Sequence, residues 1–234
     1  MELLTKEEIE GLRAFDTPTI CNAVEGFKIR DRTVGFTRPG LQRRVAWDER
    51  PMVGYARTAL ISSATPQMPI HWEIMRQYYH QYENFDLPQV AVIQDIDPVP
   101  LGSFWGDVQA TVHRALGCIG VITDVKKVGF NLFSKEILVS HAYVHIIESG
   151  GPVTVCGMTV CPGDLIHADE HGAIVIPNEI AKKVAEACKQ AMDAEEALLG
   201  PCREALQKNC KVTADQIMGW RKEMQEKRLR VGQS

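Results

Sequence analysis

A stretch of about thirty residues sets the strongest limit on how this chain folds. Val90 to Gln94 is a short apolar run, typical of a buried strand. An apolar stripe with helical spacing begins near Gly106 and ends at Gly117, where glycine favours a helix C-terminus. Cys118 to Thr123 is a second apolar run. This order of strand, loop, helix and strand predicts a βαβ unit with parallel strands, and therefore an α/β fold.

The flanking segments predict helices at both ends of the chain and strands in between. Thr5 and Glu8 have the spacing of a capping box, and Asp16 precedes a second helix start at Thr17-Pro18. The other expected elements are a strand at Met52–Ser62, a helix at Pro69–Tyr82, strands at 141–147, 152–156, 158–160 and 173–176, a helix capped by Asn178 and stopped by Gly200-Pro201, and a last helix at 214–230.

The composition excludes several classes of protein. The 234 residues are 45% hydrophobic and 24% charged, which suits a globular domain with a sizeable core. No apolar run is long enough to span a bilayer, and the acidic N-terminus does not resemble a signal peptide. The net charge of −4 disfavours nucleic acid, and the basic run at 221–230 is diluted by glutamates. Seven cysteines without a CxxC motif fit a reducing compartment, so we expect a cytoplasmic protein without a membrane or nucleic-acid partner.

The turn Gly106-Asp107-Val108-Gln109 is the first candidate site, because it lies where the predicted loop meets the predicted helix. Free N–H groups and the helix dipole favour anions at such a place, and Gly106 allows a ligand to approach the backbone. Asp107 is a candidate for binding a metal ion or its water. Each feature alone also fits an ordinary turn with a helix-stabilising acid.

Several other polar residues are weaker candidates. Asp124 follows a parallel strand, at the edge where α/β sheets bind ligands, and it equally suits a turn. Two histidine groups are present: His141 with His145 around Tyr143, and His167 with Asp169 and His171. An HxxxH pair brings two ligands together on a helix, whereas here it falls in an expected strand, which disfavours a direct histidine metal site. The absence of GxGxxG, Walker A, GxSxG and HExxH motifs weakens nucleotide-binding and serine-hydrolase interpretations.

The sequence resembles a known family in five segments, which are LRAFDTPTICNAVEG, PMVGYARTA, WGDVQATVHRALGCIGVITD, SHAYVHIIESGGPV and PGDLIHADEHGAIVIP. The family includes the 4-hydroxy-4-methyl-2-oxoglutarate aldolases and the regulator of ribonuclease activity A. The resemblance implies a swivelling β/β/α domain, the fold also found in phosphohistidine carriers. It implies a single domain over residues 1–234, with a core at about 12–197 and a helical extension at 198–234.

The resemblance also implies a reaction and an assembly. Family enzymes cleave a 4-hydroxy-2-oxo acid by a retro-aldol reaction, or decarboxylate oxaloacetate, and release pyruvate. A divalent metal, Mg²⁺ or Mn²⁺, binds the 2-oxo acid and stabilises the enolate. By motif, the N–H groups of Gly106, Asp107, Val108 and Gln109 would hold the substrate, and Asp107 would hold a metal-bound water and help to move the proton. The assembly would be a homotrimer or homohexamer with sites between subunits.

One segment departs from the family pattern. Active members continue the strand as Asp-Gly-x-x-Arg-Asp, in which the arginine holds the oxo acid and the last aspartate ligates the metal directly. Here Asp124 is followed by Val125-Lys126-Lys127-Val128-Gly129-Phe130, which matches only the end of that run. The direct ligand is therefore unknown and expected in a segment missing after Asp124. Two alternatives remain: a lyase whose full-length chain carries the pair, or a non-catalytic binding protein like the ribonuclease regulator.

Overall fold

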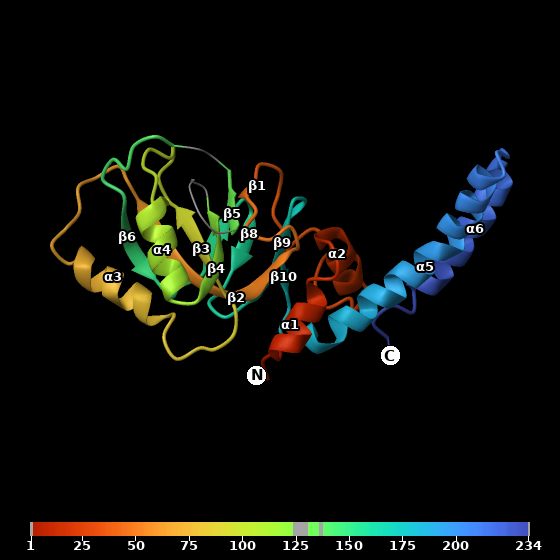
Figure 1. Cartoon of the computed structure of the whole chain (residues 1–234), viewed down its shortest axis with the longest axis horizontal. Helices are drawn as coiled ribbons and strands as arrows, with labels where there is room; N and C mark the ends of the chain where they lie inside the picture. The colour runs from red at the N-terminus through yellow and green to blue at the C-terminus, as the bar shows by residue number, and fades with distance from the viewer. Residues whose placement is uncertain (1, 124–130, 136–137, 234) are drawn as a thin grey trace.

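A computed structural model describes residues 2–123, 131–135 and 138–233 of the chain (Figure 1). Its centre is a curled sheet in the order β1-β5-β4-β3-β2-β9-β10, with β6 paired to β2 beside β9. A separate hairpin of β7 and β8 packs against the sheet. The strands are β1 (Gln42–Val45), β2 (Met52–Ser62), β3 (Gln89–Asp95), β4 (Cys118–Thr123), β5 (Asn131–Ser134), β6 (His145–Ser149), β7 (Val153–Val155), β8 (Met158–Val160), β9 (Leu165–Asp169) and β10 (Gly172–Ile176).

The helices lie at both ends of the chain and on one face of the sheet. No helix in the described part of the chain is both long and apolar enough to cross a membrane. The helices are α1 (Lys6–Leu12), α2 (Thr17–Gly26), α3 (His71–His80), α4 (Asp107–Ala115), α5 (Ala181–Gln207) and α6 (Ala214–Arg228). The α/β class with helical N- and C-terminal segments, expected from the sequence, is confirmed.

The predicted βαβ unit is confirmed at the middle of the sheet. Strands β2, β3, β4 and β5 are parallel neighbours, and α4 connects β3 to β4. In this register Val92 lies opposite Ile122. All the side chains of β5, and all but one in each of β3 and β4, are buried, because layers of structure cover both faces of this part of the sheet. The carboxyl ends of β3 and β4 therefore meet at one edge, beside the start of α4.

Three apolar clusters hold these layers together. The first joins α1, α2 and α5 to the sheet through residues such as Ile20 and Val184. The second lies under the β7–β8 hairpin and includes Met158. The third lies under α3 and α4 and includes Tyr78 and Ala110. The sheet is thus covered by the terminal helices, the small hairpin and the helix pair that carries the predicted turn.

The C-terminal helices form a hairpin that extends away from the sheet (Figure 1). With 27 residues, α5 is about 40 Å long, and it continues through Pro201. The prediction that Gly200-Pro201 ends this helix was wrong. Proline in a helix interior costs about 3 kcal/mol, and here the packing of α6 along α5 offsets that cost. The helix also begins at Ala181 without a side-chain cap, so the predicted cap at Asn178 was wrong.

The segment around His141 differs from the strand expected there. Strand β6 begins only at His145, and the preceding residues form a turn in which Val144 N–H donates to the His141 carbonyl at 3.0 Å. Ala142 has a φ of 44°, in the left-handed region that non-glycine residues rarely adopt. His141 and His145 therefore do not lie on one face of a strand, and His141 points from a turn.

Helix α4 is anchored by its buried histidine. His113 is fully buried, with Nδ1 2.7 Å from the Gln109 carbonyl and Nε2 2.7 Å from the Tyr78 hydroxyl. A carbonyl only accepts, so Nδ1 carries the hydrogen and Nε2 accepts from Tyr78. The Tyr78 hydroxyl in turn contacts that of Tyr82 at 2.6 Å, and the Trp105 ring lies 4.5 Å from the imidazole. These contacts fix α4 against α3 while keeping the imidazole neutral.

Two buried histidines make the stability of the protein depend on pH. Burial lowers the pKa of both His113 and His167 from 6.5 to about 4. Between these values the unfolded chain takes up protons that the folded chain does not, so the free energy of unfolding falls as the pH falls from 6.5 towards 4. We expect a loss of about 2 kcal/mol for each histidine between pH 7.5 and pH 5, measured by urea denaturation.

Two variants separate this effect from other titrations. His113→Gln cannot take up a proton and should lose about 2 kcal/mol less than the wild type over the same interval. His80→Gln removes an exposed histidine and should keep the full loss. Equal stability of the wild type at the two pH values would contradict the expected role of the buried imidazoles.

Candidate functional site

Three segments from different parts of the chain meet at the carboxyl edge of the parallel strands. Asp97, just after β3, accepts hydrogen bonds from the Ser62 hydroxyl at 2.6 Å and from the Ser63 N–H and hydroxyl at 2.7 Å. Burial alone would raise the pKa of Asp97, but these hydrogen bonds outweigh it and lower the pKa. The Ser63 hydroxyl also accepts from the Gly102 N–H at 2.9 Å. The carboxylate thus ties the end of β2 to the loop that leads into α4.

The Gly106 turn has the features of an anion site. Gly106 is the N-cap of α4, in an extended conformation, and no side chain caps this helix within the described structure. The first-turn N–H groups therefore have no intrahelical acceptor and face the space before the helix. Among the described residues, a Cβ on Gly106 would meet only His141 Cε1, at 4.0 Å, so no other described side chain fills this space. The helix dipole adds partial positive charge at the same point.

The other predicted residues of the turn have different surroundings. Asp107 and Val108 are exposed, so the Asp107 carboxylate is available to a ligand or a hydrated ion. The Gln109 side chain is half-buried, and its Oε1 accepts from the Tyr79 hydroxyl at 3.2 Å. The Gln109 side-chain oxygen is therefore already bonded, while its backbone N–H remains available to the turn. The structure brings Gly106, Asp107 and the first-turn backbone together, as the sequence predicted, but it does not test their binding role.

A histidine that the sequence analysis assigned to a strand lies beside this turn. The Nδ1 atom of His141 is 2.6 Å from the Ser103 carbonyl, and Ser103 N–H donates to the Ser140 carbonyl at 2.8 Å. Tyr143 N–H donates to the Ser63 carbonyl at 3.3 Å. These bonds attach the turn before β6 to the loop before α4. The imidazole of His141 is consequently held in front of Gly106.

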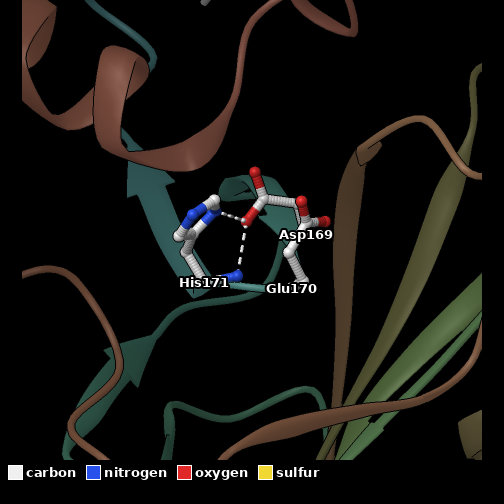
Figure 2. Close-up of side chains that lie close together, drawn as sticks. All are labelled: Asp169, Glu170 and His171. Carbon is white, nitrogen blue, oxygen red and sulfur yellow. Dashed lines mark hydrogen bonds and ion pairs between the residues drawn. The ribbon is translucent and has the colours of Figure 1, made fainter.

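A second cluster, at the β9–β10 turn, has a structural role (Figure 2). Asp169, Glu170 and His171 form the only group of three possible metal-ligating side chains within the described residues. The buried Asp169 carboxylate already accepts from the N–H of Thr17 at 2.6 Å and from that of His171 at 2.8 Å. His171 Nδ1 adds a contact at 3.2 Å. The Asp169 carboxylate therefore accepts hydrogen bonds from the first residue of α2 and from the tight β9–β10 turn.

His167 also connects β9 to the N-terminal helices. Its Nε2 lies 3.0 Å from the Phe15 carbonyl, so Nε2 carries the hydrogen, and Nδ1 accepts from the Thr17 hydroxyl at 2.9 Å. Both ring nitrogens are used. The β9–β10 turn lies beside Met52, where β2 begins, whereas Ser62 ends the same strand at the Asp97 loop. Eleven residues of strand separate the two places by about 30 Å, so His167 and Asp169 cannot serve the Gly106 turn of the same chain.

A cavity of about 710 Å³ lies at the opposite edge from the Gly106 turn, where β4 begins. Two of its arginine side chains are engaged in contacts within the protein. Arg13 lies 2.5 Å from Asp48 and donates to the Pro51 carbonyl, and the Arg114 guanidinium stacks over the Trp47 ring at 4.5 Å. These contacts hold α1 and the β1–β2 loop to the base of the sheet.

The residues at the Gly106 turn fit only part of a metal site. An exposed carboxylate such as that of Asp107 suits a hydrated Mg²⁺, which usually keeps several waters and binds one or two carboxylates. No group of three metal-ligating side chains surrounds Asp107 in the described ranges. Asp124 and the segment after it, where the sequence analysis expected a direct ligand, lie outside the described residues.

Comparisons with known proteins agree on one fold. The family model named RraA-like and described as Aldolase/RraA matches residues 17–175. An uncharacterized protein from Pseudomonas syringae pv. tomato str. DC3000 has 20% identity and a TM-score of 0.67, over 93% of this chain and 95% of that chain. Streptomyces coelicolor RraAS2, described as an unusual member of the RNase ES inhibitor RraA protein family, has 20% identity and a TM-score of 0.63, over 84% and 96%. At these identities the likeness shows the fold.

Two glycine substitutions test the geometry of the loop before α4. A Cβ on Gly102 would overlap the His141 carbonyl and lie 2.6 Å from Ser63 Cβ, so Gly102→Ala should lower the free energy of unfolding by about 1–3 kcal/mol. Gly106→Ser places its Cβ in open space and adds a hydroxyl that can cap α4. This control should be neutral or slightly stabilising in urea denaturation. The reverse order of stabilities would contradict the packing described for the loop.

Proposed function

This chain belongs to the RraA-like family, described as Aldolase/RraA, and from that membership we propose that it is a lyase that forms pyruvate. The substrate would be a 4-hydroxy-2-oxo acid cleaved by a retro-aldol reaction, or oxaloacetate that loses carbon dioxide. The observation that carries the proposal is the uncapped start of α4, with a glycine N-cap in open space and the exposed Asp107 as its first residue.

The backbone of this turn supplies the binding interaction that the reaction needs. A 2-oxo acid carries a carboxylate beside its carbonyl oxygen, and the reaction places further negative charge on that oxygen. First-turn N–H groups and the helix dipole stabilise such charge. The Asp97 bonds to Ser62 and Ser63 keep the loop in place, so the donors are positioned before the substrate arrives.

Asp107 has two roles in this proposal. It would hold a divalent cation, Mg²⁺ or Mn²⁺, through a water molecule, and the bound cation would supply Lewis-acid stabilisation of the charge on the substrate oxygen. The carboxylate would also help to move a proton at the reacting carbon. Its exposure at the start of α4 leaves the carboxylate open to solvent and to a hydrated ion.

The substitution Asp107→Asn tests the proposed role directly. It preserves the shape of the side chain and removes its charge, so turnover should fall by about a hundredfold or more if the carboxylate handles a proton. Pyruvate release from a 4-hydroxy-2-oxo acid and from oxaloacetate is followed with a coupled assay. Chelator should abolish both activities, and added Mg²⁺ or Mn²⁺ should restore them.

Asp215 provides a matched control, because it too is an acid in the first turn of a helix and lies on the remote α6. Asp215→Asn should keep the wild-type rates. Equal rates with and without chelator would refute the metal dependence. An Asp107→Asn variant as fast as the wild type would show that another group handles the proton.

A non-catalytic binding protein is the second candidate function. It is favoured by the sequence after Asp124, which lacks the Arg-Asp pair found in active members of the family. RraAS2, which shares the fold, is described as a member of an RNase inhibitor family. Absence of pyruvate release from both substrates, at any concentration of Mg²⁺ or Mn²⁺, would support this alternative over the lyase.

We also propose that the chain forms a homotrimer or homohexamer. Three large apolar side chains at the start of α3 remain exposed in the single chain: Met68 at 67%, Ile70 at 58% and Trp72 at 69% of their surface. Side chains of this size and kind are enriched at protein–protein interfaces. Sedimentation equilibrium at micromolar concentration should give a trimer or hexamer, and a monomer alone would contradict the proposal.

A charge at this surface should weaken the assembly. We expect Trp72→Arg to raise the dissociation constant at least about tenfold, because a large aromatic anchor is lost and a charge is buried. Met218→Arg is the control, since Met218 is similarly exposed, at 63%, but lies on α6. It should leave the assembly unchanged.

A further inference from the structure

Within the described ranges, His141 is the side chain outside α4 that lies nearest to a Cβ on Gly106. Its Cε1 is 4.0 Å from the position of a Cβ on Gly106, and this atom is bonded to both ring nitrogens. The Ser103 carbonyl accepts from Nδ1 at 2.6 Å, so Nδ1 carries the hydrogen. In the neutral ring Nε2 is therefore left with a lone pair. No hydrogen-bond partner of Nε2 is found among the described residues, and the side chain is exposed.

Backbone contacts with two other segments set the position of the turn that carries this imidazole. Ser103 N–H donates to the Ser140 carbonyl at 2.8 Å, and Tyr143 N–H donates to the Ser63 carbonyl at 3.3 Å. Ala142 holds a left-handed conformation, with a φ of 44°. Such a conformation costs about 1 kcal/mol or more in a non-glycine residue, and it persists where surrounding contacts enforce it. These contacts therefore hold the backbone of the turn, and with it the His141 imidazole, in one position.

We infer that His141 is a catalytic residue of the retro-aldol reaction, taking the proton from the C4 hydroxyl of the substrate at Nε2. The inference rests on the proposed function. A 2-oxo acid whose carboxylate lies on the first-turn N–H groups places C4 three carbon–carbon bonds, of about 1.5 Å each, from C1. The His141 imidazole, whose Cε1 lies 4.0 Å from the position of a Cβ on Gly106, is close enough to the turn to meet that end of the molecule.

The proton and electron pairs balance in this step. Nε2 takes the hydroxyl proton, and the O–H electron pair becomes the second bond of a carbonyl at C4. The C3–C4 bond breaks, and its electrons form the C2–C3 double bond of the pyruvate enolate, whose oxygen faces the first-turn N–H groups. The protonated imidazole then gives up the proton, and Asp107 helps to move it to C3, which gives pyruvate and leaves the ring neutral again.

The two proposed reactions differ in their need for this base. Oxaloacetate has no C4 hydroxyl to lose a proton, because its C4 is a carboxylate that leaves as carbon dioxide when the C3–C4 bond breaks. Loss of the imidazole should therefore impair retro-aldol cleavage far more than decarboxylation. Asp107, by contrast, would serve both reactions, because both pass through the same enolate. The ratio of the two rates thus distinguishes the role of His141 from that of Asp107.

The experiment compares His141→Asn with the wild type on 4-hydroxy-4-methyl-2-oxoglutarate and oxaloacetate, in the presence of Mg²⁺. The asparagine amide can donate to the Ser103 carbonyl as Nδ1 does, while nothing replaces Nε2. We expect the ratio of retro-aldol to decarboxylation kcat/KM to fall about a hundredfold or more. Tyr143→Phe, an exposed neighbour on the same turn, is the control and should keep the wild-type ratio.

Each other outcome also decides the question. An equal fall in both rates would assign His141 a structural role, and an unchanged ratio would remove it from the reaction. A wild-type protein that only decarboxylates would also overturn the inference. If the wild-type protein cleaves only the hydroxy acid, the test is to add free imidazole to the His141→Gly variant. We expect its retro-aldol rate to rise about tenfold or more. The absence of any such rise would refute the catalytic role of His141. Absence of both activities in the wild type refutes the proposed function itself.

Discussion

The hydrogen bond between His113 and Tyr78 is the contact on which the arrangement around α4 depends. It joins the helix that carries the candidate site to α3, and it lies in a pocket that keeps the imidazole neutral. The same histidine bonds the Gln109 carbonyl one turn closer to the start of the helix. The His113 imidazole therefore attaches the backbone of the candidate site to the hydrophobic core. Its burial also lowers the free energy of unfolding at low pH.

Much of the fold was predictable because its signals are local. Strands β2 and β4 match their predicted bounds, since runs rich in strand-forming residues are sufficient to identify them. Strand β1 lies in a charged segment without a local strand signal, and it is a strand because it pairs with β5 at the edge of the sheet. The passage of α5 through Pro201 depends on α6, which follows it in the chain. Strand β1 and the part of α5 beyond Pro201 are therefore determined by tertiary contacts, which no local sequence pattern indicates.

The candidate site was predictable to a similar extent. The Gly106-Asp107 turn follows from its place between a strand and a helix. The contacts that brace it join residues more than thirty positions apart, such as Ser63 with Asp97 and His141 with Ser103. No periodicity signals such pairs, and the alternation around His141 suggested a strand that begins only at His145. One signal was present, since His141 lies within SHAYVHIIESGGPV, one of the segments that resemble the family.

The last residues of the chain return to its first helices. Val231 belongs to the same apolar cluster as Leu4 and Ile20, and a methyl group on Gly26 would collide with its side chain. The family model matches residues 17–175, so Leu4 and Val231 of this cluster lie outside the match. During synthesis α1 and α2 emerge from the ribosome long before Val231, which completes their apolar face from far along the chain. This layer of the protein can therefore finish folding only after Val231 has emerged, which leaves its apolar surface open to chaperones until then.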